Sequence, residues 1–250
     1  MPLISIVTPS YNPVPDHLLA AYESVRSQRL PDGWDLEWVI QEDGSTGAAM
    51  EILPPDPIVT FAMGRRGGVA LTRNLALARS RGELIKNLDH DDVLMPDVLM
   101  RDIGVLAADP LVQWTTSRVL DLLPDGSTVA FDSDPPGGRL EPGFVYDHWR
   151  KNSYRLPVHP TTICVRRELA VALGGWMGIP GSDDTGLLVP ASVISHGWFH
   201  SEVGLLYRKW PGQETARTEH YAALEWDLRM RLVAERAEAV RAMWPQVTVS

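Results

Sequence analysis

The run Asp89-His90-Asp91-Asp92 is the part of the sequence best suited to chemistry, because it directly follows an apolar segment that ends at Leu88. Two carboxylates two residues apart at the end of a strand can converge on one hard cation, and oxygen ligands select Mg²⁺ or Mn²⁺. Such a cation would bridge the oxygens of a diphosphate and neutralise charge on a leaving nucleotide. Aspartate is also favoured at turns and helix N-caps, so these residues alone are equally consistent with a cap of the next helix.

Two further polar segments follow predicted strands. They are Thr8-Pro9-Ser10-Tyr11-Asn12-Pro13 and Gln41-Glu42-Asp43-Gly44-Ser45. Ligands of open parallel sheets bind beyond the carboxyl ends of the strands. Three polar strand ends therefore predict a ligand crevice at one edge of a sheet.

Alternating strands and helices over the first 110 residues predict a parallel, doubly wound sheet. In this part the apolar patterns and the Pro and Gly signals predict strands at Leu3–Val7, Leu36–Ile40, Ile58–Phe61 and Glu83–Leu88, with helices at Asp16–Gln28, Val69–Arg79 and Pro96–Ala108. Later strands are expected at Val112–Ser117, Thr128–Phe131, Thr161–Val165 and Glu202–Tyr207, and helices at Arg167–Leu173 and Glu219–Met243. The Pro- and Gly-rich segment Asp132–Pro142 is expected to be a loop.

The composition narrows the class of protein. A net charge of −9 over 250 residues argues against a general nucleic-acid binder, which carries basic surface to neutralise phosphates. Cys164 is the single cysteine, so an intrachain disulfide and an all-cysteine metal site are excluded. No signal peptide or membrane-spanning run is recognisable, and a soluble, cytoplasmic protein is expected.

The ordered set of motifs resembles family 2 glycosyltransferases, which have the GT-A fold. The resemblance covers roughly residues 3 to 215 and is strongest in the first 100. It is carried by Ser5-Ile-Val-Thr-Pro-Ser-Tyr-Asn12, Glu42-Asp-Gly-Ser45, Arg73-Asn74 and Leu88-Asp-His-Asp-Asp92. It implies a mostly parallel central sheet flanked by helices, a smaller acceptor-side region and a long C-terminal helix. The expected parts are a nucleotide-sugar-binding half (1–110), an acceptor-binding half of the same domain (111–215) and a C-terminal helical extension (216–250).

By this resemblance, the nucleotide site comprises Thr8, Pro9, Tyr11, Asp43, Arg73 and Asp89. The Tyr11 ring would stack on the base, and Asp43 would accept a hydrogen bond from the N–H of uracil. Arg73 would reach the nucleotide or its phosphates, because a guanidinium suits phosphate geometry. Gly67 and Gly68 would let the backbone approach the ligand.

The resemblance also implies a metal site for Mn²⁺ or Mg²⁺ with Asp91 as direct ligand. Asp89 is its candidate second carboxylate, although it is expected to face the ribose or sugar, and Asp92 is left as a helix cap. A late segment of the family often reads Tyr-Arg-x-His, and its histidine can complete the metal shell. Here Trp210 occupies that place, so the third ligand is open; His196, His200 and His220 lie nearby in sequence.

On the acceptor side, Pro180-Gly-Ser-Asp-Asp-Thr-Gly-Leu187 resembles the acidic motif that precedes a helix in this family. Asp184 matches the aspartate that acts as base, and Asp183 stands where glutamate is usual. Asp184 is expected to be ionised at neutral pH, because the helix dipole favours the anion. The remaining donor-sugar and acceptor candidates are Gly175, Trp176 and His159.

Three functions fit these residues. The first is inverting transfer of a sugar from a nucleotide-sugar, with a UDP-sugar as the expected donor, to an unidentified acceptor hydroxyl. The second is a catalytically silent module that binds a sugar nucleotide, which the Trp210 substitution keeps open. The third is a nucleotidyltransferase, but that class needs a Gly-rich, arginine-containing loop after the first strand, where this chain has Thr8-Pro9-Ser10-Tyr11-Asn12.

Overall fold

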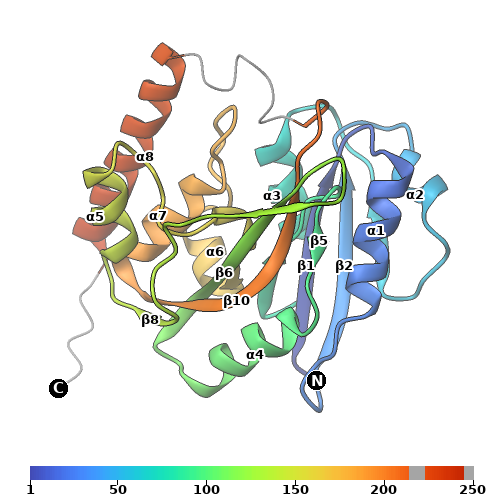
Figure 1. The fold of residues 1–250 in the computed structure, drawn as a ribbon, viewed down its shortest axis with the longest axis horizontal. Coiled ribbons are helices and arrows are strands. Elements are labelled where there is room, and N and C mark those ends of the chain that lie inside the picture. Colours follow the sequence, from blue (N-terminus) through green and yellow to red (C-terminus); the bar gives the residue numbers. More distant parts are fainter. Residues whose placement is uncertain (214–222, 245–250) are drawn as a thin grey trace.

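Ten strands in the described residues, 1–213 and 223–244, form one sheet in the computed structural model (Figure 1). The strands are β1 Leu3–Ser10, β2 Asp35–Glu42, β3 Val59–Ala62, β4 Leu84–Asn87, β5 Val93–Leu94, β6 Val112–Leu122, β7 Thr128–Ala130, β8 Gly138–Leu140, β9 Cys164–Arg166 and β10 His196–Arg208. The helices are α1 Pro15–Arg26, α2 Ala48–Ile52, α3 Val69–Arg79, α4 Val98–Ala108, α5 Phe144–Lys151, α6 Arg167–Ala172, α7 Thr185–Ile194 and α8 Ala223–Met243, with a 3-10 turn, η1, at Pro160–Thr162.

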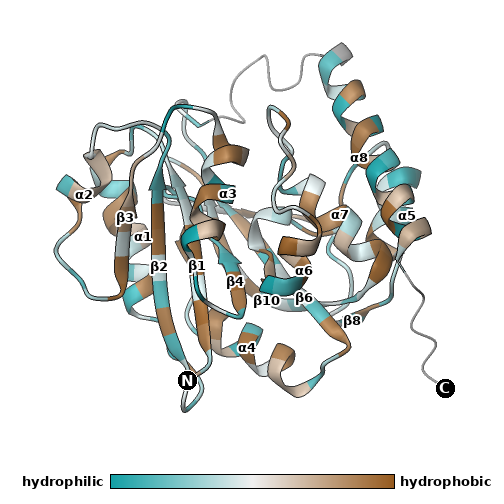
Figure 2. Cartoon of the chain, turned by 180° about the vertical axis from the view of Figure 1, so that it is seen from behind, coloured by the Kyte–Doolittle hydropathy of each residue, from teal (hydrophilic) through white to brown (hydrophobic). Residues whose placement is uncertain are grey.

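The parallel half of the sheet has the strand order β3-β2-β1-β4. Successive residues of β1 face opposite sides, so Ile4 and Ile6 pack with α1 and α4, whereas Val7 packs with α3. Figures 1 and 2, which view the molecule from opposite sides, show α1 and α3 on opposite faces of these strands. Figure 2 also shows hydrophobic residues along β1, β2 and β4, as expected for strands that are covered on both faces. The predicted α/β fold is confirmed in this half.

The second half continues the same sheet. β9 is antiparallel to both β4 and β6, and therefore links the two halves. β10 runs parallel to β6, while β5 and β8 pair with β10, and β7 pairs with β6, in antiparallel fashion. The sheet is thus mixed and continuous across the boundary expected at residue 110. The division into nucleotide and acceptor halves stays a prediction.

A second helical layer covers the late strands. α7 is buried along its length and packs against α8 and α5 through a cluster that includes Val189, Val193, Trp149, Val233 and Ala237. The long C-terminal helix is confirmed from Ala223 to Met243, and its expected first residues, 219–222, lie outside the described residues. Within the described ranges, no helix is long and apolar enough to cross a membrane.

The predicted strand Thr161–Val165 is wrong in its first half. Pro160 begins the 3-10 turn η1, in which the Ile163 N–H donates to the Pro160 carbonyl, and the strand starts only at Cys164. Threonines favour strands in general, but here their side chains bond to tertiary partners, as when Thr162 Oγ1 donates to the His159 carbonyl at 2.8 Å. Such partners are not visible in a local pattern.

The expected loop Asp132–Pro142 is also partly wrong, because it contains β8. This short strand forms only as a partner of β10, which is itself longer than the predicted Glu202–Tyr207. α5 follows at Phe144–Lys151, in a region without a predicted element. β8 depends on a partner strand that is distant in the chain, which a local pattern does not show. α5 is amphipathic and buries Val145, Tyr146 and Trp149, so its local signal was present and was missed.

A buried ion pair joins β4 to α4. Lys86 Nζ lies 2.8 Å from Asp102 Oδ2, and the two side chains are 1% and 0% exposed. Lys86 also donates to the Thr162 carbonyl at 2.6 Å, and Thr115 Oγ1 donates to Asp102 Oδ1 at 2.6 Å. Burial acts to raise the pKa of Asp102, but the Lys86 charge and the hydrogen bond from His200 outweigh it and hold that pKa at about 2.

We expect Lys86→Met to lower the free energy of unfolding by about 3–5 kcal/mol, because Asp102 would remain buried without its cation. Urea unfolding at neutral pH measures the loss. The Lys86→Met/Asp102→Asn double variant should recover part of it, and a double variant less stable than Lys86→Met would contradict the pairing. Since the folded pKa of Asp102 is depressed, its contribution should be complete above about pH 4 and disappear as the pH falls toward 2.

Candidate functional site

The carboxyl ends of β1, β2 and β4 lie side by side at one edge of the sheet. Val7 of β1 is in register with Val39 of β2 and with Asn87 of β4. The three polar segments that follow these positions therefore leave the sheet at the same level, next to the amino end of α3 (Figure 1). This edge is where an open α/β sheet binds its ligand.

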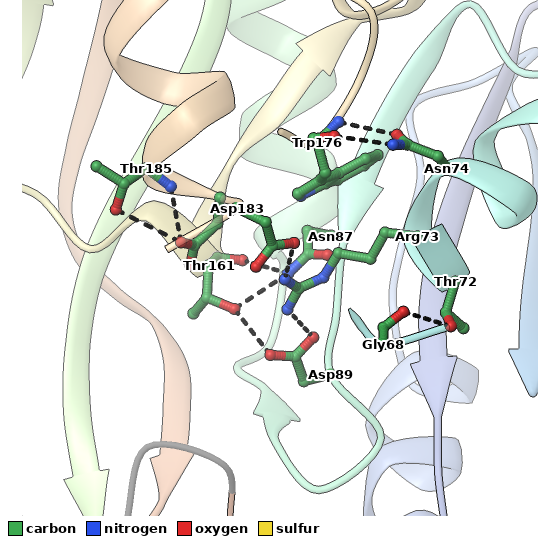
Figure 3. Close-up of polar contacts among 11 residues, drawn as sticks. Gly68, Thr72, Arg73, Asn74, Asn87, Asp89, Thr161, Trp176, Asp183 and Thr185 are labelled. Atoms are coloured by element: carbon green, nitrogen blue, oxygen red, sulfur yellow. Dashed lines mark hydrogen bonds and ion pairs between the residues drawn. The ribbon is translucent and has the colours of Figure 1, made fainter. Parts of the chain in front are cut away.

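Arg73 of α3 connects this edge to the acidic pair that precedes α7 (Figure 3). Its side chain is 5% exposed. Nη1 donates to Asp183 Oδ2 at 2.7 Å, and Nη2 donates to Asp89 Oδ1 at 2.5 Å. The other oxygen of Asp89 accepts from Thr161 Oγ1 at 3.4 Å. The guanidinium that was expected to reach the phosphates thus bridges two carboxylates in this structure.

The acids around Arg73 differ in their pKa values. Burial raises the pKa of Asp183 to about 6 against the lowering effect of Arg73, and the neighbouring Asp184 adds to the rise. Burial also raises the pKa of Asp184. Burial acts in the same direction on Asp89, but there the charge and hydrogen bond of Arg73 prevail, and the pKa of Asp89 lies below its ordinary value. The carboxylates in turn hold the pKa of Arg73 well above its usual range despite its burial, so the guanidinium is charged.

Asp183 and Asp184 have different surroundings although they are adjacent. Asp183 is 3% exposed and paired with Arg73, whereas Asp184 is half-buried and is the N-cap of α7. One oxygen of Asp184, Oδ1, accepts the Thr185 backbone N–H at 2.7 Å. Asp184 is therefore the more open carboxylate of the pair.

The segment after β1 presents one open aromatic ring. Tyr11 is 37% exposed, and the guanidinium carbon of Arg66 lies 4.4 Å from its ring centroid. Thr8 is buried, and its hydroxyl accepts the Trp38 indole N–H at 2.7 Å. The carbonyl of Pro9 lies 3.2 Å from His90 Nδ1. Of these residues, Tyr11 is placed to meet a flat ligand with its side chain.

Asp43, after β2, holds the start of α3. Its Oδ1 accepts the backbone N–H groups of Gly67 at 2.6 Å and Gly68 at 3.2 Å, and its Oδ2 accepts that of Gly68 at 3.1 Å. Gly68 has a φ of +87°, which a residue with a side chain rarely adopts. These contacts explain why a carboxylate and two glycines stand at these positions, and the contact of Asp43 with uracil stays a prediction.

Asp91 has a partner that the sequence did not reveal. The indole Nε1 of Trp210 donates to Asp91 Oδ2 at 2.7 Å, and the guanidinium Nε of Arg208 donates to the Asp91 carbonyl at 2.7 Å. No cluster of three or more His, Cys, Asp or Glu side chains in the described part of the chain could hold a metal ion. The donor set therefore fits a divalent cation only in a reduced form, in which Asp91 is the single protein ligand and phosphates and water complete the shell.

The other candidates for a third ligand lie elsewhere. His196 Nδ1 accepts from Arg139 Nε at 3.2 Å, and His200 is buried with its Nε2 3.4 Å from Asp102 Oδ1. His220 lies outside the described residues. Asp92 does not cap the following helix, because its Oδ1 accepts the Arg208 backbone N–H at 2.9 Å and α4 begins only at Val98.

The expected sugar-side residues are mostly buried. Trp176 is 1% exposed and packs in the core, so its ring offers no open stacking face in this structure. Asn74 fixes the Trp176 backbone by accepting its N–H at 2.9 Å and donating to its carbonyl at 2.8 Å (Figure 3). A Cβ at position 175 would lie 2.1 Å from Asn74 Oδ1, so only glycine fits at this position. The sequence did not single out this role of Asn74, although its place in the Arg73-Asn74 motif was a signal.

His159 is half-buried and lies against two aromatic rings. Its ring centroid is 4.8 Å from that of Tyr207 and 6.4 Å from that of Phe131, which follows β7. Burial lowers the pKa of His159 to about 4, so the imidazole is neutral at pH 7. Its role toward the sugar or the acceptor stays a prediction.

Comparison with known proteins agrees with this geometry. Residues 5–122 match the family described as Glycosyl transferase family 2. The chondroitin synthase of Pasteurella multocida is 32% identical over 136 residues, which are 52% of this chain and 14% of that protein. The chondroitin synthase of Escherichia coli is 32% identical over 127 residues, which are 48% of this chain and 18% of that protein. The chain thus spans less than a fifth of the length of these relatives.

The fold is shared with solved structures. TarS 1–349 of S. aureus in complex with UDP-GlcNAc superimposes with a TM-score of 0.68 at 15% identity, covering 97% of this chain and 71% of that one. The complex of the same protein with UDP gives a TM-score of 0.64 at 15% identity, covering 97% and 70%. At this identity the likeness shows the fold, and the family rests on the sequence match. The resemblance inferred from the motifs is confirmed: residues 5–122 match a glycosyl transferase family 2 domain, and the α/β structure of the chain has the GT-A fold.

Proposed function

We propose that this chain is an inverting glycosyltransferase that moves a sugar from a UDP-sugar to an acceptor hydroxyl. The observation that carries the proposal is the bridge from Asp89 through Arg73 to Asp183, which leaves Asp184 as the more open carboxylate of the pair. The structural likeness to a protein solved with UDP-GlcNAc supports uridine as the nucleoside of the donor.

In the proposed reaction Asp184 is the general base. It takes the proton of the acceptor hydroxyl while that oxygen attacks the anomeric carbon from the face opposite the diphosphate. The new C–O bond forms as the bond to the diphosphate breaks, so the configuration inverts and UDP leaves. Asp183 is a positioning residue in this scheme, because its carboxylate is buried and paired with Arg73.

The donor side of the proposal uses the residues after β1, β2 and β4. The exposed Tyr11 ring stacks on uracil next to Thr8 and Pro9, and Asp43 accepts the uracil N–H while it holds Gly67 and Gly68. A divalent cation on Asp91 would supply positive charge to the departing diphosphate. Asp89, fixed by Arg73, faces the ribose or the sugar.

We expect Asp184→Asn to lower kcat by about 10²–10⁴-fold, the usual contribution of a general base, while the affinity for UDP stays within about twofold. An amide cannot take the proton, but it can still accept the Thr185 N–H and keep the start of α7 in place. Release of UDP from a panel of UDP-, dTDP- and GDP-sugars measures turnover, and calorimetry with UDP measures affinity.

The matched control is Asp147→Asn, an exposed aspartate of α5, which should leave both quantities unchanged. Asp183→Asn should differ from both variants by lowering the melting temperature, because it removes a buried partner of Arg73. A fall of UDP affinity as large as the fall of kcat in Asp184→Asn would contradict the assignment of the base. UDP binding without release from any donor would instead favour the silent binding module.

The raised pKa values of the acidic pair predict the pH dependence of the reaction. The base must be ionised, and burial raises the pKa of Asp184 and that of Asp183, the latter to about 6. The two carboxyls interact, so the acid limb belongs to the pair. We expect kcat/KM to fall with decreasing pH well above the ordinary aspartate range of about 4. Steady-state rates, with circular dichroism at each pH to verify folding, test this, and a rate that is constant down to about pH 4 would contradict it.

A further inference from the structure

The indole of Trp210 is fixed over Asp91 by several independent contacts. Besides the hydrogen bond to Asp91 Oδ2, its ring meets the His17 ring edge-on at a centroid distance of 5.3 Å and an interplanar angle of 75°. A Cβ added to Gly212 would lie 2.0 Å from the indole, so the ring packs directly on that glycine. Gln213 Oε1 accepts the Trp210 backbone N–H at 3.2 Å. These contacts fix the orientation of the Trp210 side chain beside Asp91.

An indole N–H is a donor only, so Trp210 cannot be a metal ligand. Its hydrogen bond also occupies one of the two oxygens of the carboxylate that is expected to bind the cation. The oxygens of Asp89 are engaged by Arg73 and Thr161. Asp91 Oδ1 is therefore the one oxygen of Asp89 and Asp91 without a hydrogen bond, and these two acids supply far fewer than the roughly six oxygen ligands that Mg²⁺ and Mn²⁺ require.

The charge of Arg208 also disfavours binding of a free cation at Asp91. The Arg208 guanidinium donates to the Asp91 carbonyl, and the Arg208 backbone N–H donates to Asp92 Oδ1, so a positive charge lies beside Asp91. This charge opposes a free divalent cation but favours a complex of the cation with a diphosphate, whose net charge is negative. A diphosphate would also supply the oxygens that the protein lacks.

We propose that Trp210, by donating its indole N–H to Asp91, makes divalent-cation binding conditional on the nucleotide diphosphate. The proposal rests on the proposed donor site and deepens it: Trp210 determines when the metal binds. The protein alone should leave Mn²⁺ almost free, and Mn²⁺ should bind only together with UDP.

The test is titration of the protein with Mn²⁺, with and without UDP, following the free Mn²⁺ signal by electron paramagnetic resonance. Trp210→Phe removes the donor but keeps an aromatic ring on Gly212. We expect it to tighten Mn²⁺ binding without UDP, because the positive end of the indole N–H dipole at Asp91 Oδ2 opposes a cation there. The expected change is about 10–100-fold, the size of effect that a hydrogen-bond partner of a metal ligand usually has, with the opposite sign. Trp210→His adds an imidazole ligand and should tighten it at least as much. Circular dichroism verifies that both variants are folded.

The matched control is Trp34→His. Trp34 precedes β2 at the amino end of the parallel strands, so this variant should bind Mn²⁺ like the unmodified protein. Two results would overturn the inference: Mn²⁺ binding by the unmodified protein that is equally tight with and without UDP, or Phe and His variants that bind Mn²⁺ alone no better than the unmodified protein. Both leave the proposed transfer reaction intact if UDP still binds. Absence of UDP binding, with or without Mn²⁺, would overturn the proposed function and this inference together.

Discussion

Burial of the Arg73 guanidinium is the constraint on which the arrangement of the site depends. A cation with 5% exposure is stable in a protein interior only if carboxylates compensate it, and removal of one partner leaves a costly unpaired charge. Asp89 lies just after β4, whereas Asp183 lies 110 residues after Arg73 in the chain. One side chain of α3 therefore fixes the distance between the strand-end crevice and the start of α7, which are also the two places where donor and acceptor chemistry would have to meet.

Arg73 pairs with both Asp89 and Asp183, but the pKa values of these two carboxyls shift in opposite directions. The side chain of Asp183 is 4% exposed and that of Asp89 is 23% exposed, so burial costs the Asp183 anion more. Arg73 consequently lowers the pKa of Asp89 below its ordinary value but does not compensate the burial of Asp183, whose pKa stays raised. The surroundings thus divide two identical residue types into a carboxyl whose pKa is lowered, Asp89, and one whose pKa is raised to about 6, Asp183.

The parallel half of the fold was predictable because its signals are local. Apolar strands alternate there with amphipathic helices, and Gly67, Gly68 and Gly82 mark the limits of α3, so Val69–Arg79 was predicted to the residue. The second half depends on partners that are distant in the chain. Gly138–Leu140 becomes a strand only beside β10, and Thr161 and Thr162 form a 3-10 turn whose side chains bond to other elements. The types of the site residues could be read in the same way, but their partners could not: Trp210 and Asp91 are 119 residues apart, and nothing local relates them.

The acidic edge of the sheet raises the question of how it could bind an anionic nucleotide. Much of its negative charge is already compensated by backbone N–H groups. Glu42 accepts those of Thr46 and Gly47, and Asp43 accepts those of Gly67 and Gly68. The single charge of Arg73 is shared between Asp89 and Asp183. These bonds also hold the segments after β2 and β4 and the starts of α3 and α7 in place, so the acids stabilise the shape of the site while their charge is partly compensated.

Two carboxylates at this edge remain less fully engaged. Asp91 accepts one indole N–H, and Asp184 accepts the N–H of the residue that follows it. On the proposed function these two have the distinct tasks of holding a cation against the diphosphate and taking the proton of the acceptor. The side-chain contacts of both are to neutral donors, the Trp210 indole for Asp91 and the backbone N–H and hydroxyl of Thr185 for Asp184, so neither forms a direct ion pair in the described part of the chain. A set of seven acids around one buried arginine is thereby reduced to two working carboxylates, since burial and the neighbouring Asp91 and Asp89 raise the pKa of Asp92 well above its usual range.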